Sequence, residues 1–513
     1  MHDYDRDEEF SPEPAVPEEE PLEVLPVAPE KKGHAVLAWT AIILVVGFIF
    51  AIRIYREDTE KEGKPERPTE RDEMGLLLLR MQGRYFVGAA NLMSSAAKEL
   101  YPHVQGLNKG PVEHRLAVIT LAGELAGPEE AEKQLEELDS KLRAHKREHP
   151  DHKHLTPEDA STKDILQRLY ADYAEGEFAA PSVSDSERLL VRNRLDWFGE
   201  LALAPAQGPD KAARQAVIGS ATRTFVALFS AVVGLGLVAV VGFVGLILFL
   251  IFLFNGSLQT GIHCGSTHGS VYAETFALYL ITYFGLNFGL SFVHALAGWT
   301  LPVAGASALF SLVALAWPVV RGIPWRQVRE EIGLTMGRKP ALEPLVGVGG
   351  YAITLPILGV GVAIMLVLLL IAGSFKGLES PDEFSTQGGL PYHPIVLALV
   401  RPNWWVRLQV LVLACVVAPI VEETMFRGVL YRHLRESSWR LGFFLSVMIS
   451  AVVVSFVFAV IHPQGLIAVP ALMALAFGFS LVREWRGTLI PGMVAHGLNN
   501  GLALCLAILA FGD

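Results

Sequence analysis

Long apolar runs alternate with polar stretches along this chain. A helix that crosses a membrane needs about 20 mostly apolar residues, because each residue advances it by about 1.5 Å. The apolar runs therefore predict an all-α, polytopic membrane protein with about nine transmembrane helices. The predicted spans are residues 35–52, 225–254, 275–297, 301–320, 345–374, 408–427, 441–461, 466–482 and 489–511.

One polar stretch, residues 56–216, is long enough to fold by itself. It has mixed charge with helical periodicity, and helix starts are readable where Thr156 precedes Pro157 and where Ser184 lies three residues before Glu187. We expect a soluble helical domain inserted after the first span. Its helix pairs resemble the hairpins of repeat proteins, although no fixed period is present. A partner-binding surface and a plain helical spacer are both open interpretations.

The chain divides into five predicted parts. Residues 1–34 hold eleven Asp or Glu residues and repeated Pro, with too little apolar surface to fold, and should form a disordered acidic tail. Residues 35–52 follow as a transmembrane anchor that we expect to be retained, because the tail lacks the features of a cleaved signal. Three further parts follow: the soluble helical domain, membrane helices over 225–374 and a final group of helices over 396–513.

Composition strengthens the membrane assignment, since 51% of the residues are hydrophobic and only 19% are charged. The formal net charge is -11, and the acidic tail accounts for -8 of it, because its eleven acids face three basic residues. The remainder is near neutral, so the overall charge offers no surface for a nucleic acid. Three widely spaced cysteines, Cys264, Cys415 and Cys505, imply no disulfide framework.

Basic residues in short connections predict the orientation, because such connections stay cytoplasmic. If the chain has nine spans, all three basic connections are cytoplasmic when the N-terminus is cytoplasmic. Residues 56–216 then lie outside. Arg53, Arg56 and Lys61 argue for the opposite, so the side that holds this domain stays open. The three basic connections contain Arg321, Arg326, Arg329, Arg338 and Lys339, then Arg432, Arg435 and Arg440, and then Arg483 and Arg486.

Three charges interrupt one membrane segment, APIVEETMFRGVL at residues 418–430, and they are Glu422, Glu423 and Arg427. A charge inside a bilayer costs on the order of 3 kcal/mol, so such residues pair with one another or face a cavity. Glu423 and Arg427 are four residues apart with the acid first, the favourable order for an ion pair on a helix. Glu422 lies about 100° further around the helix, which leaves its carboxylate for catalysis.

Two later spans contain polar interruptions of their own. His462 ends the run Phe458-Ala-Val-Ile-His just before Pro463, which disfavours helix at the preceding residue. His496 and Asn500 are four residues apart and share one face of the last span. Polar groups that face the same way in a membrane helix indicate a shared cavity.

Depth is a geometric difficulty for such a cavity. About 20 Å of helix separates Glu422 from the basic turn near Arg435, whereas about 32 Å separates Leu441 from His462. Straight, parallel helices would place Glu422 and His462 at different depths. A tilt, a broken helix or an extension of the first helix into the cytoplasm would resolve the difference.

These side chains suit the hydrolysis of an acyl bond in a dry pocket. Glu422 can accept a proton from a water molecule that a histidine positions, and His496 with Asn500 can donate to the oxyanion. A second mechanism uses the same residues, because Glu422, His462 and His496 form a His2Glu set that could hold zinc with an open position for water. The residue pattern leaves both mechanisms open.

The order EExxxR, FxxxH and HxxxN on successive membrane helices resembles the CPBP family of intramembrane proteases. That family includes the type II CAAX prenyl endopeptidases and bacteriocin-processing enzymes. The resemblance covers residues 408–511, and REEIGLTMG at 329–337 is similar to a connection in many bacterial members. It implies that residues 396–513 are the protease core.

The resemblance also favours a glutamate-activated water over zinc, so no cofactor is favoured. It implies one role for each polar side chain of these helices: water activation by Glu422 and His462, an oxyanion hole from His496 and Asn500, and support from Glu423 and Arg427.

We therefore expect an intramembrane endopeptidase of the bacterial cell membrane, acting on a membrane-associated peptide or protein near the cytoplasmic side. The motifs define hydrolytic chemistry and leave open whether the substrate is CAAX-like and prenylated. The alternative is a membrane scaffold or immunity-type protein that binds a protein partner through residues 56–216. An ion-coupled transporter is the least favoured class, because the two halves show no inverted repeat.

Overall fold

Every element in the computed structural model is helical, and its described residues contain no strand. This confirms the all-α fold class. The predicted tail, residues 1–34, lies almost entirely outside the described part of the chain, as does Cys264. The structure describes residues 33–62, 70–93, 96–148, 155–179, 181–257, 260–262, 268–297, 300–376, 384, 395–400 and 403–511.

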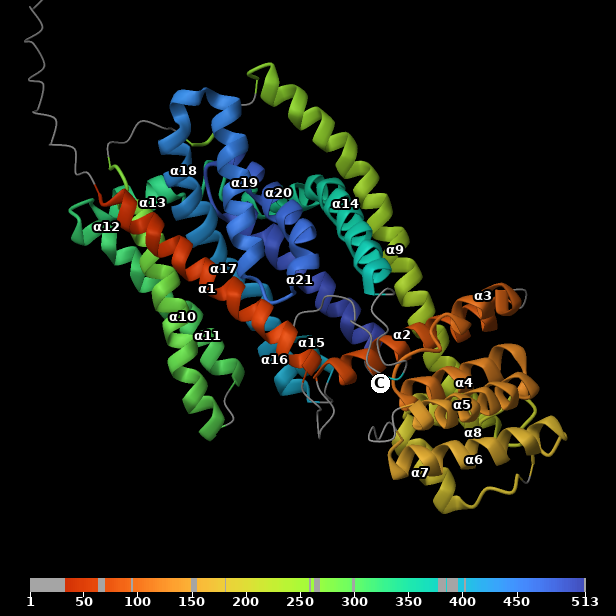
Figure 1. Ribbon diagram of the computed structural model, residues 1–513. Helices are drawn as coiled ribbons and strands as arrows, with labels where there is room; N and C mark the ends of the chain where they lie inside the picture. The colour runs from red at the N-terminus through yellow and green to blue at the C-terminus, as the bar shows by residue number, and fades with distance from the viewer. Residues whose placement is uncertain are drawn as a thin grey trace, which may run out of the picture.

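The first membrane helix is followed by seven shorter helices that form a separate cluster (Figure 1). The cluster has a hydrophobic core of its own, which includes Leu116, Leu135 and Leu166. These eight helices are α1 (Ala35–Glu62), α2 (Glu70–Leu92), α3 (Ala96–Gln105), α4 (Val112–Ala126), α5 (Pro128–Glu148), α6 (Pro157–Ala174), α7 (Asp185–Leu195) and α8 (Trp197–Leu203).

Both predicted helix starts in this cluster are present. The side chain of Thr156 accepts a hydrogen bond from the Asp159 N–H at the start of α6. Ser184 and Glu187 form a reciprocal capping box at the start of α7. Such caps satisfy N–H groups that a helix leaves unpaired in its first turn, which is why the local sequence predicts these ends well.

The upstream membrane region begins with α9, a single helix of 44 residues. Its length of about 66 Å is twice the hydrocarbon thickness of a bilayer. Its first turns belong to the α2–α8 cluster, where Arg214 pairs with Glu124 at 2.6 Å. The helices of this region are α9 (Lys211–Phe254), α10 (Val271–Ala297), α11 (Thr300–Ser311), η1 (Leu312–Leu315), α12 (Ala316–Val320), α13 (Trp325–Ile332), α14 (Glu343–Lys376) and α15 (Ile395–Val400).

The last part of the chain is a group of helices beside α14 (Figure 1). One long helix with internal changes of winding, a hairpin of two helices and a final helix make up this group. Its elements are α16 (Trp404–Val412), η2 (Leu413–Val417), α17 (Ala418–Glu422), η3 (Glu423–Leu430), α18 (Tyr431–Ser438), η4 (Trp439–Leu441), α19 (Phe443–Ile461), η5 (Leu466–Ala468), α20 (Val469–Arg486) and α21 (Ile490–Phe511).

Seven helices of the described chain are long and apolar enough to cross a membrane, which marks a multi-pass membrane protein. Counting the pair Ala304–Val320 and Trp325–Ile332, bent by 117°, as one span gives eight. The sequence predicted about nine spans, and the described residues supply seven or eight of them. The predicted span 275–297 lies within α10, which is helical as far as Ala297.

The predicted basic connections meet at one end of the membrane bundle. Arg486 at the end of α20 pairs with Glu343 at the start of α14, with a distance of 2.6 Å. Arg435 on α18 pairs with Glu484 on α20 at 2.9 Å, and both side chains are buried. These two ion pairs join the connections to one another. We call the end of the bundle that contains Glu343, Arg435, Glu484 and Arg486 the basic end.

The N-terminus of α1 also lies at the basic end. Glu274 on α10 accepts a hydrogen bond from the His34 N–H and pairs with Arg321 at 3.2 Å. His268 and Glu331 join the start of α10 to α13 with a separation of 3.1 Å, and this hydrogen bond raises the pKa of His268. The first helix therefore enters the bundle from the basic end.

The α2–α8 cluster lies at the opposite end of the bundle. Arg80 on α2 donates to the carbonyl of Phe511, the last residue of α21, at 2.7 Å. Helix α21 begins beside the basic end, where the Leu489 N–H donates to the carbonyl of Gly333. Its 22 residues then advance about 33 Å, roughly the thickness of a bilayer core. The cluster and the basic connections are thus separated by the membrane region.

An extension of α18 resolves the expected mismatch in depth between Glu422 and His462. The hydroxyls of Ser438 and Ser446 are 2.7 Å apart, so the end of α18 pairs with the first turns of α19. From Ser446 to Ile461 the helix advances about 22 Å, and from Arg435 back to Glu422 about 20 Å. Glu422 and His462 therefore reach a similar depth, near the middle of the bundle rather than at its basic end.

The separation of the two ends predicts a labelling pattern. We expect Lys133→Cys on α5 to react with a membrane-impermeant maleimide in intact cells, and Glu330→Cys on α13 to react only after permeabilisation. Both native side chains are solvent-exposed, at 63% and 57%. The unsubstituted protein gives the background from its own cysteines. Labelling of both positions from one side would contradict this arrangement.

Candidate active site

The helix that carries the predicted carboxylates changes its winding twice. Residues Leu413–Val417 and Glu423–Leu430 are π-helical, with the short α-helix α17 between them. Pro419 contributes to the first change, because a proline has no N–H to donate to the preceding turn. The sequence predicted a membrane span over 408–427, and the two π-helices interrupt its α-helical winding.

Glu422, the last residue of α17, faces both predicted histidines. Its Oε2 atom lies 3.6 Å from Nε2 of His462 and 3.7 Å from Nε2 of His496. His462 follows the last residue of α19 in an extended conformation, as Pro463 predicts, and His496 projects from the second turn of α21. Three elements far apart in the sequence therefore bring these side chains together.

The proton positions on the two imidazoles follow from their other contacts. Nδ1 of His462 lies 2.6 Å from the carbonyl oxygen of Phe458, and Nδ1 of His496 lies 2.9 Å from Oε1 of Glu423. Both oxygens can only accept, so each Nδ1 carries a proton. In the neutral imidazoles Nε2 is then an acceptor that faces a carboxylate oxygen. A donor such as a water molecule would satisfy these acceptors.

Glu423 connects His496 to the predicted ion pair. Its Oε1 atom lies 3.0 Å from Nη1 of Arg427, and both side chains are almost fully buried, with exposed fractions of 1% and 0%. The predicted Glu423–Arg427 pair is therefore present. Gly492 on α21 leaves room for the carboxylate, since a β-carbon there would lie 3.0 Å from Oε2 of Glu423.

Aromatic rings enclose the polar cluster. The ring of Phe458 lies 4.1 Å from that of His462, measured between centroids, and Phe479 stacks on His496 at 5.4 Å. The Arg427 guanidinium lies over Phe458 at 4.5 Å from its centroid. Such rings displace water and lower the local dielectric, which strengthens the charge interactions inside.

Asn500 is bound to the backbone of the neighbouring helix. Its Nδ2 atom donates to the carbonyl of Ala414 in η2 at 2.8 Å, and its Oδ1 atom accepts from Asn499 at 3.2 Å. In a π-helix the Ala414 carbonyl would receive the N–H five residues on, and that residue is Pro419. Asn500 therefore supplies the donor that Pro419 lacks.

The zinc alternative requires three ligands that converge on one point. Glu422, His462 and His496 have the right chemistry for a His2Glu site. Within the described ranges, however, no group of three or more His, Cys, Asp or Glu side chains is arranged to hold a metal ion. The present geometry therefore does not fit a zinc site, and we derive no catalytic step through a metal.

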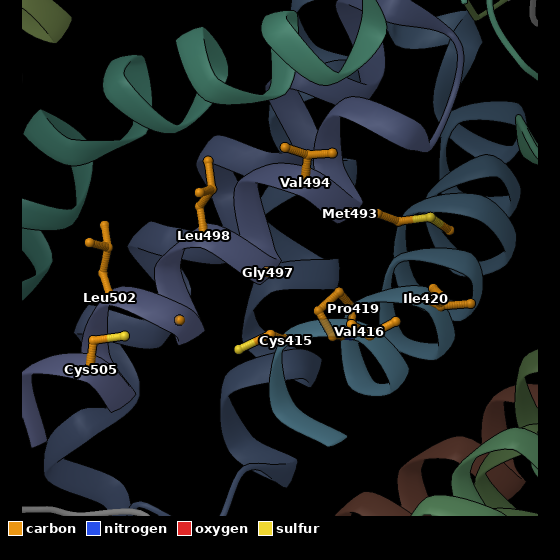
Figure 2. A pocket seen from close by; sticks show the side chains of 11 residues that line it. Cys415, Val416, Pro419, Ile420, Met493, Val494, Gly497, Leu498, Leu502 and Cys505 are labelled. Carbon is orange, nitrogen blue, oxygen red and sulfur yellow. The ribbon is translucent and has the colours of Figure 1, made fainter. Parts of the chain in front are cut away.

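An apolar groove with a volume of about 530 Å³ lies between two of the same helices (Figure 2). Cys415, Pro419 and Ile420 line one wall, and Gly497 and Leu498 on α21 belong to the other. The two walls meet closely, since a β-carbon on Gly497 would lie 2.6 Å from the Cys415 carbonyl oxygen. Gly497 directly follows His496 in the sequence, so the groove adjoins the polar cluster.

A carboxylate, two imidazoles and a buried ion pair within membrane helices define a candidate hydrolytic site. Residues 403–502 match the family model described as type II CAAX prenyl endopeptidase Rce1-like. This part of the chain is therefore an Rce1-like domain, and it includes Glu422, His462, His496 and Asn500. The match covers about one fifth of the chain and leaves α1–α15 outside. No curated protein and no solved structure matches the chain.

The burial of the Glu423–Arg427 pair predicts a loss of stability when one partner is removed. We expect Arg427→Met to lower the free energy of unfolding by about 3 to 5 kcal/mol, because Glu423 would remain buried without its cation. Thermal unfolding of the purified protein in detergent measures this. Glu422→Gln is the matched control and should unfold at or above the wild-type temperature. Equal Tm values for Arg427→Met and wild type would contradict the role of the pair.

Proposed function

We propose that this protein is an intramembrane endopeptidase that hydrolyses a peptide bond of a membrane-associated substrate with a water molecule activated by Glu422. The observation that carries the proposal is the position of Glu422 Oε2 between two imidazole Nε2 atoms, at 3.6 and 3.7 Å. The Rce1-like domain at residues 403–502 supports the same reaction class.

The first step is the attack of water on the scissile carbonyl. A water molecule between Glu422 and His462 donates one hydrogen to the carboxylate and one to Nε2 of the imidazole, which aims an oxygen lone pair outward. As the oxygen bonds to the carbonyl carbon, its proton passes to Glu422. Glu422 can take up this proton because a carboxylate within hydrogen-bond reach of the attacking water acts as its general base.

The second step is the collapse of the tetrahedral intermediate. The protonated Glu422 returns the proton to the nitrogen of the leaving amine, the C–N bond breaks and the carboxylate is restored. His496 stays oriented toward the reaction throughout, because Glu423 holds its Nδ1 and Arg427 holds Glu423. This chain of contacts gives Glu423 and Arg427 a supporting role without direct contact to the substrate.

The depth of the site and its surroundings favour a substrate that enters the bilayer. Glu422 lies about 20 Å of helix from Arg435 at the basic end and about 27 Å from Trp404 at the other end. The groove beside it is lined by apolar side chains, which suits an apolar segment of the substrate. A peptide anchored in the membrane, CAAX-like or otherwise, meets both conditions.

Substitutions at the three reacting side chains test the proposal. We expect Glu422→Gln, His462→Ala and His496→Ala each to lower the rate of cleavage of a membrane-associated reporter peptide by at least about 100-fold. Glu422 transfers the proton, His462 positions the water and His496 is the second imidazole that faces Glu422. Mass spectrometry of the purified protein with the reporter in lipid vesicles measures cleavage. Full activity of Glu422→Gln would refute the mechanism.

Two matched controls accompany that assay. Asn499→Ala changes the neighbour of Asn500 outside the proposed reaction path and should retain most of the activity. Glu330→Gln changes an exposed carboxylate at the basic end and should have no effect on the rate. A comparable loss in both controls would indicate that the assay reports folding rather than chemistry.

A metal assay separates the two mechanisms that the sequence leaves open. We expect the purified active protein to contain far less than one zinc ion per chain and to keep its activity after dialysis against a chelator, because the described side chains do not converge on a metal position. Elemental analysis and activity are measured on the same sample. Stoichiometric zinc, lost together with activity and restored with it, would contradict the water mechanism.

A further inference from the structure

We propose that Tyr283 on α10 is a further catalytic residue, whose phenol donates a hydrogen bond to the oxygen of the scissile carbonyl as it becomes negative. Tyr279, one turn earlier, is the positioning residue behind it. The inference rests on the proposed function and extends it beyond the Rce1-like domain, because α10 lies upstream of residues 403–502.

Helix α10 packs directly against the segment that carries the carboxylates. The ring of Phe426 in η3 meets Phe276 at a centroid distance of 5.2 Å and Tyr279 at 6.3 Å, both edge to face. Phe426 also meets Phe458 at 5.2 Å, and Phe458 contacts His462. A continuous aromatic layer thus links α10 to the reacting imidazole.

The direction of the two helices places Tyr283 near Glu422. Helix α10 begins at the basic end, where Glu274 pairs with Arg321, and runs away from it. The helix from α17 to α18 runs toward the basic end, so the two are antiparallel. Tyr279 contacts Phe426. Tyr283 lies four residues further along α10, about 6 Å away from the basic end, and Glu422 lies four residues before Phe426, in the same direction. Tyr283 and Glu422 are therefore at about the same level.

The electrostatic contacts of the two tyrosines agree with this register. The charge of Glu422 acts on the phenols of both Tyr279 and Tyr283. The two rings stack at 5.9 Å between centroids with an angle of 20° between their planes. Tyr279 is buried, with 2% of its surface exposed, whereas Tyr283 is only half-buried and can meet a substrate.

Each further donor to the oxyanion stabilises it, and a phenol on α10 would add one to those expected from His496 and Asn500. Nδ1 of His496 donates to Glu423, which leaves Nε2 of the neutral ring as an acceptor. Asn500 uses one of its amide hydrogens for the Ala414 carbonyl. A phenol has a hydroxyl that rotates to suit its acceptor, and α10 brings one to the site from outside the Rce1-like domain.

The role assigned to Tyr283 involves no transfer of its proton. Its O–H donates to the carbonyl oxygen in the substrate complex and more strongly to the oxyanion of the tetrahedral intermediate. The reaction is accelerated only by the amount by which this hydrogen bond is stronger in the intermediate than in the substrate complex. Loss of one oxyanion donor typically lowers kcat by about 100-fold to 1,000-fold, with a smaller effect on substrate binding.

The test is Tyr283→Phe in the full-length protein, assayed with the membrane-associated reporter peptide. We expect kcat to fall by about 100-fold while KM changes little, because the phenylalanine preserves the ring and its stacking on Tyr279. A purely structural role for Tyr283 would instead lower the Tm or raise KM. Wild-type kcat in this variant would overturn the inference.

Tyr272→Phe is the matched control on the same helix. Tyr272 donates to Glu331 at the basic end, so its loss removes a phenol from α10 far from Glu422. We expect kcat of this variant to stay within about threefold of wild type, well short of the loss of an oxyanion donor. An equal loss of kcat in Tyr272→Phe and Tyr283→Phe would assign both effects to the packing of α10 and overturn the inference.

A second readout covers the case in which Tyr283→Phe fails to fold. Incorporation of difluorotyrosine at position 283 keeps the hydroxyl but makes it ionise at lower pH. We expect activity to fall with rising pH in this protein and not in wild type, because the ionised phenol cannot donate. A pH profile equal to wild type would overturn the inference. If Glu422→Gln is inactive while Tyr283→Phe and the difluorotyrosine protein both keep wild-type activity, the inference is overturned and the proposed function is still supported.

Discussion

The buried contact between Glu423 and Arg427 is the interaction on which the candidate site depends. Removing two charges from water is costly, and their attraction offsets that cost only when both partners are held in place. The guanidinium lies over Phe458, and the carboxylate also receives Nδ1–H of His496. One ion pair therefore fixes the orientation of an imidazole on α21, whose Nε2 then faces Glu422.

A second constraint comes from the backbone around this pair. Pro419 withholds a hydrogen-bond donor within the membrane, where an unpaired carbonyl is costly. Asn500 supplies the donor to Ala414 and so links α21 to η2, while Gly497 lets the two backbones approach. Asn500 therefore contributes to the architecture of the site.

Much of this arrangement could be predicted from the residue pattern. The spacing of Glu423 and Arg427 indicated their ion pair, and Pro463 indicated the end of the helix at His462. The π-helices were not predicted, because apart from Pro419 the sequence holds no local signal for a change of winding. Phe479 and Gly492 gave no signal either, since an aromatic residue and a glycine are common in any membrane helix. The tyrosines of α10 gave no signal, because they lie in a predicted span that contains none of the three motifs.

The most direct test of the central claim is a comparison of new peptide termini in membranes of cells that carry either the wild-type protein or Glu422→Gln. If Glu422 activates the attacking water, membrane-associated proteins in wild-type cells should show cleaved termini that are absent with Glu422→Gln, while both forms accumulate to the same level. Identical sets of termini, together with an unchanged cellular function of the variant, would contradict the account and favour a scaffold that binds its partner through α2–α8.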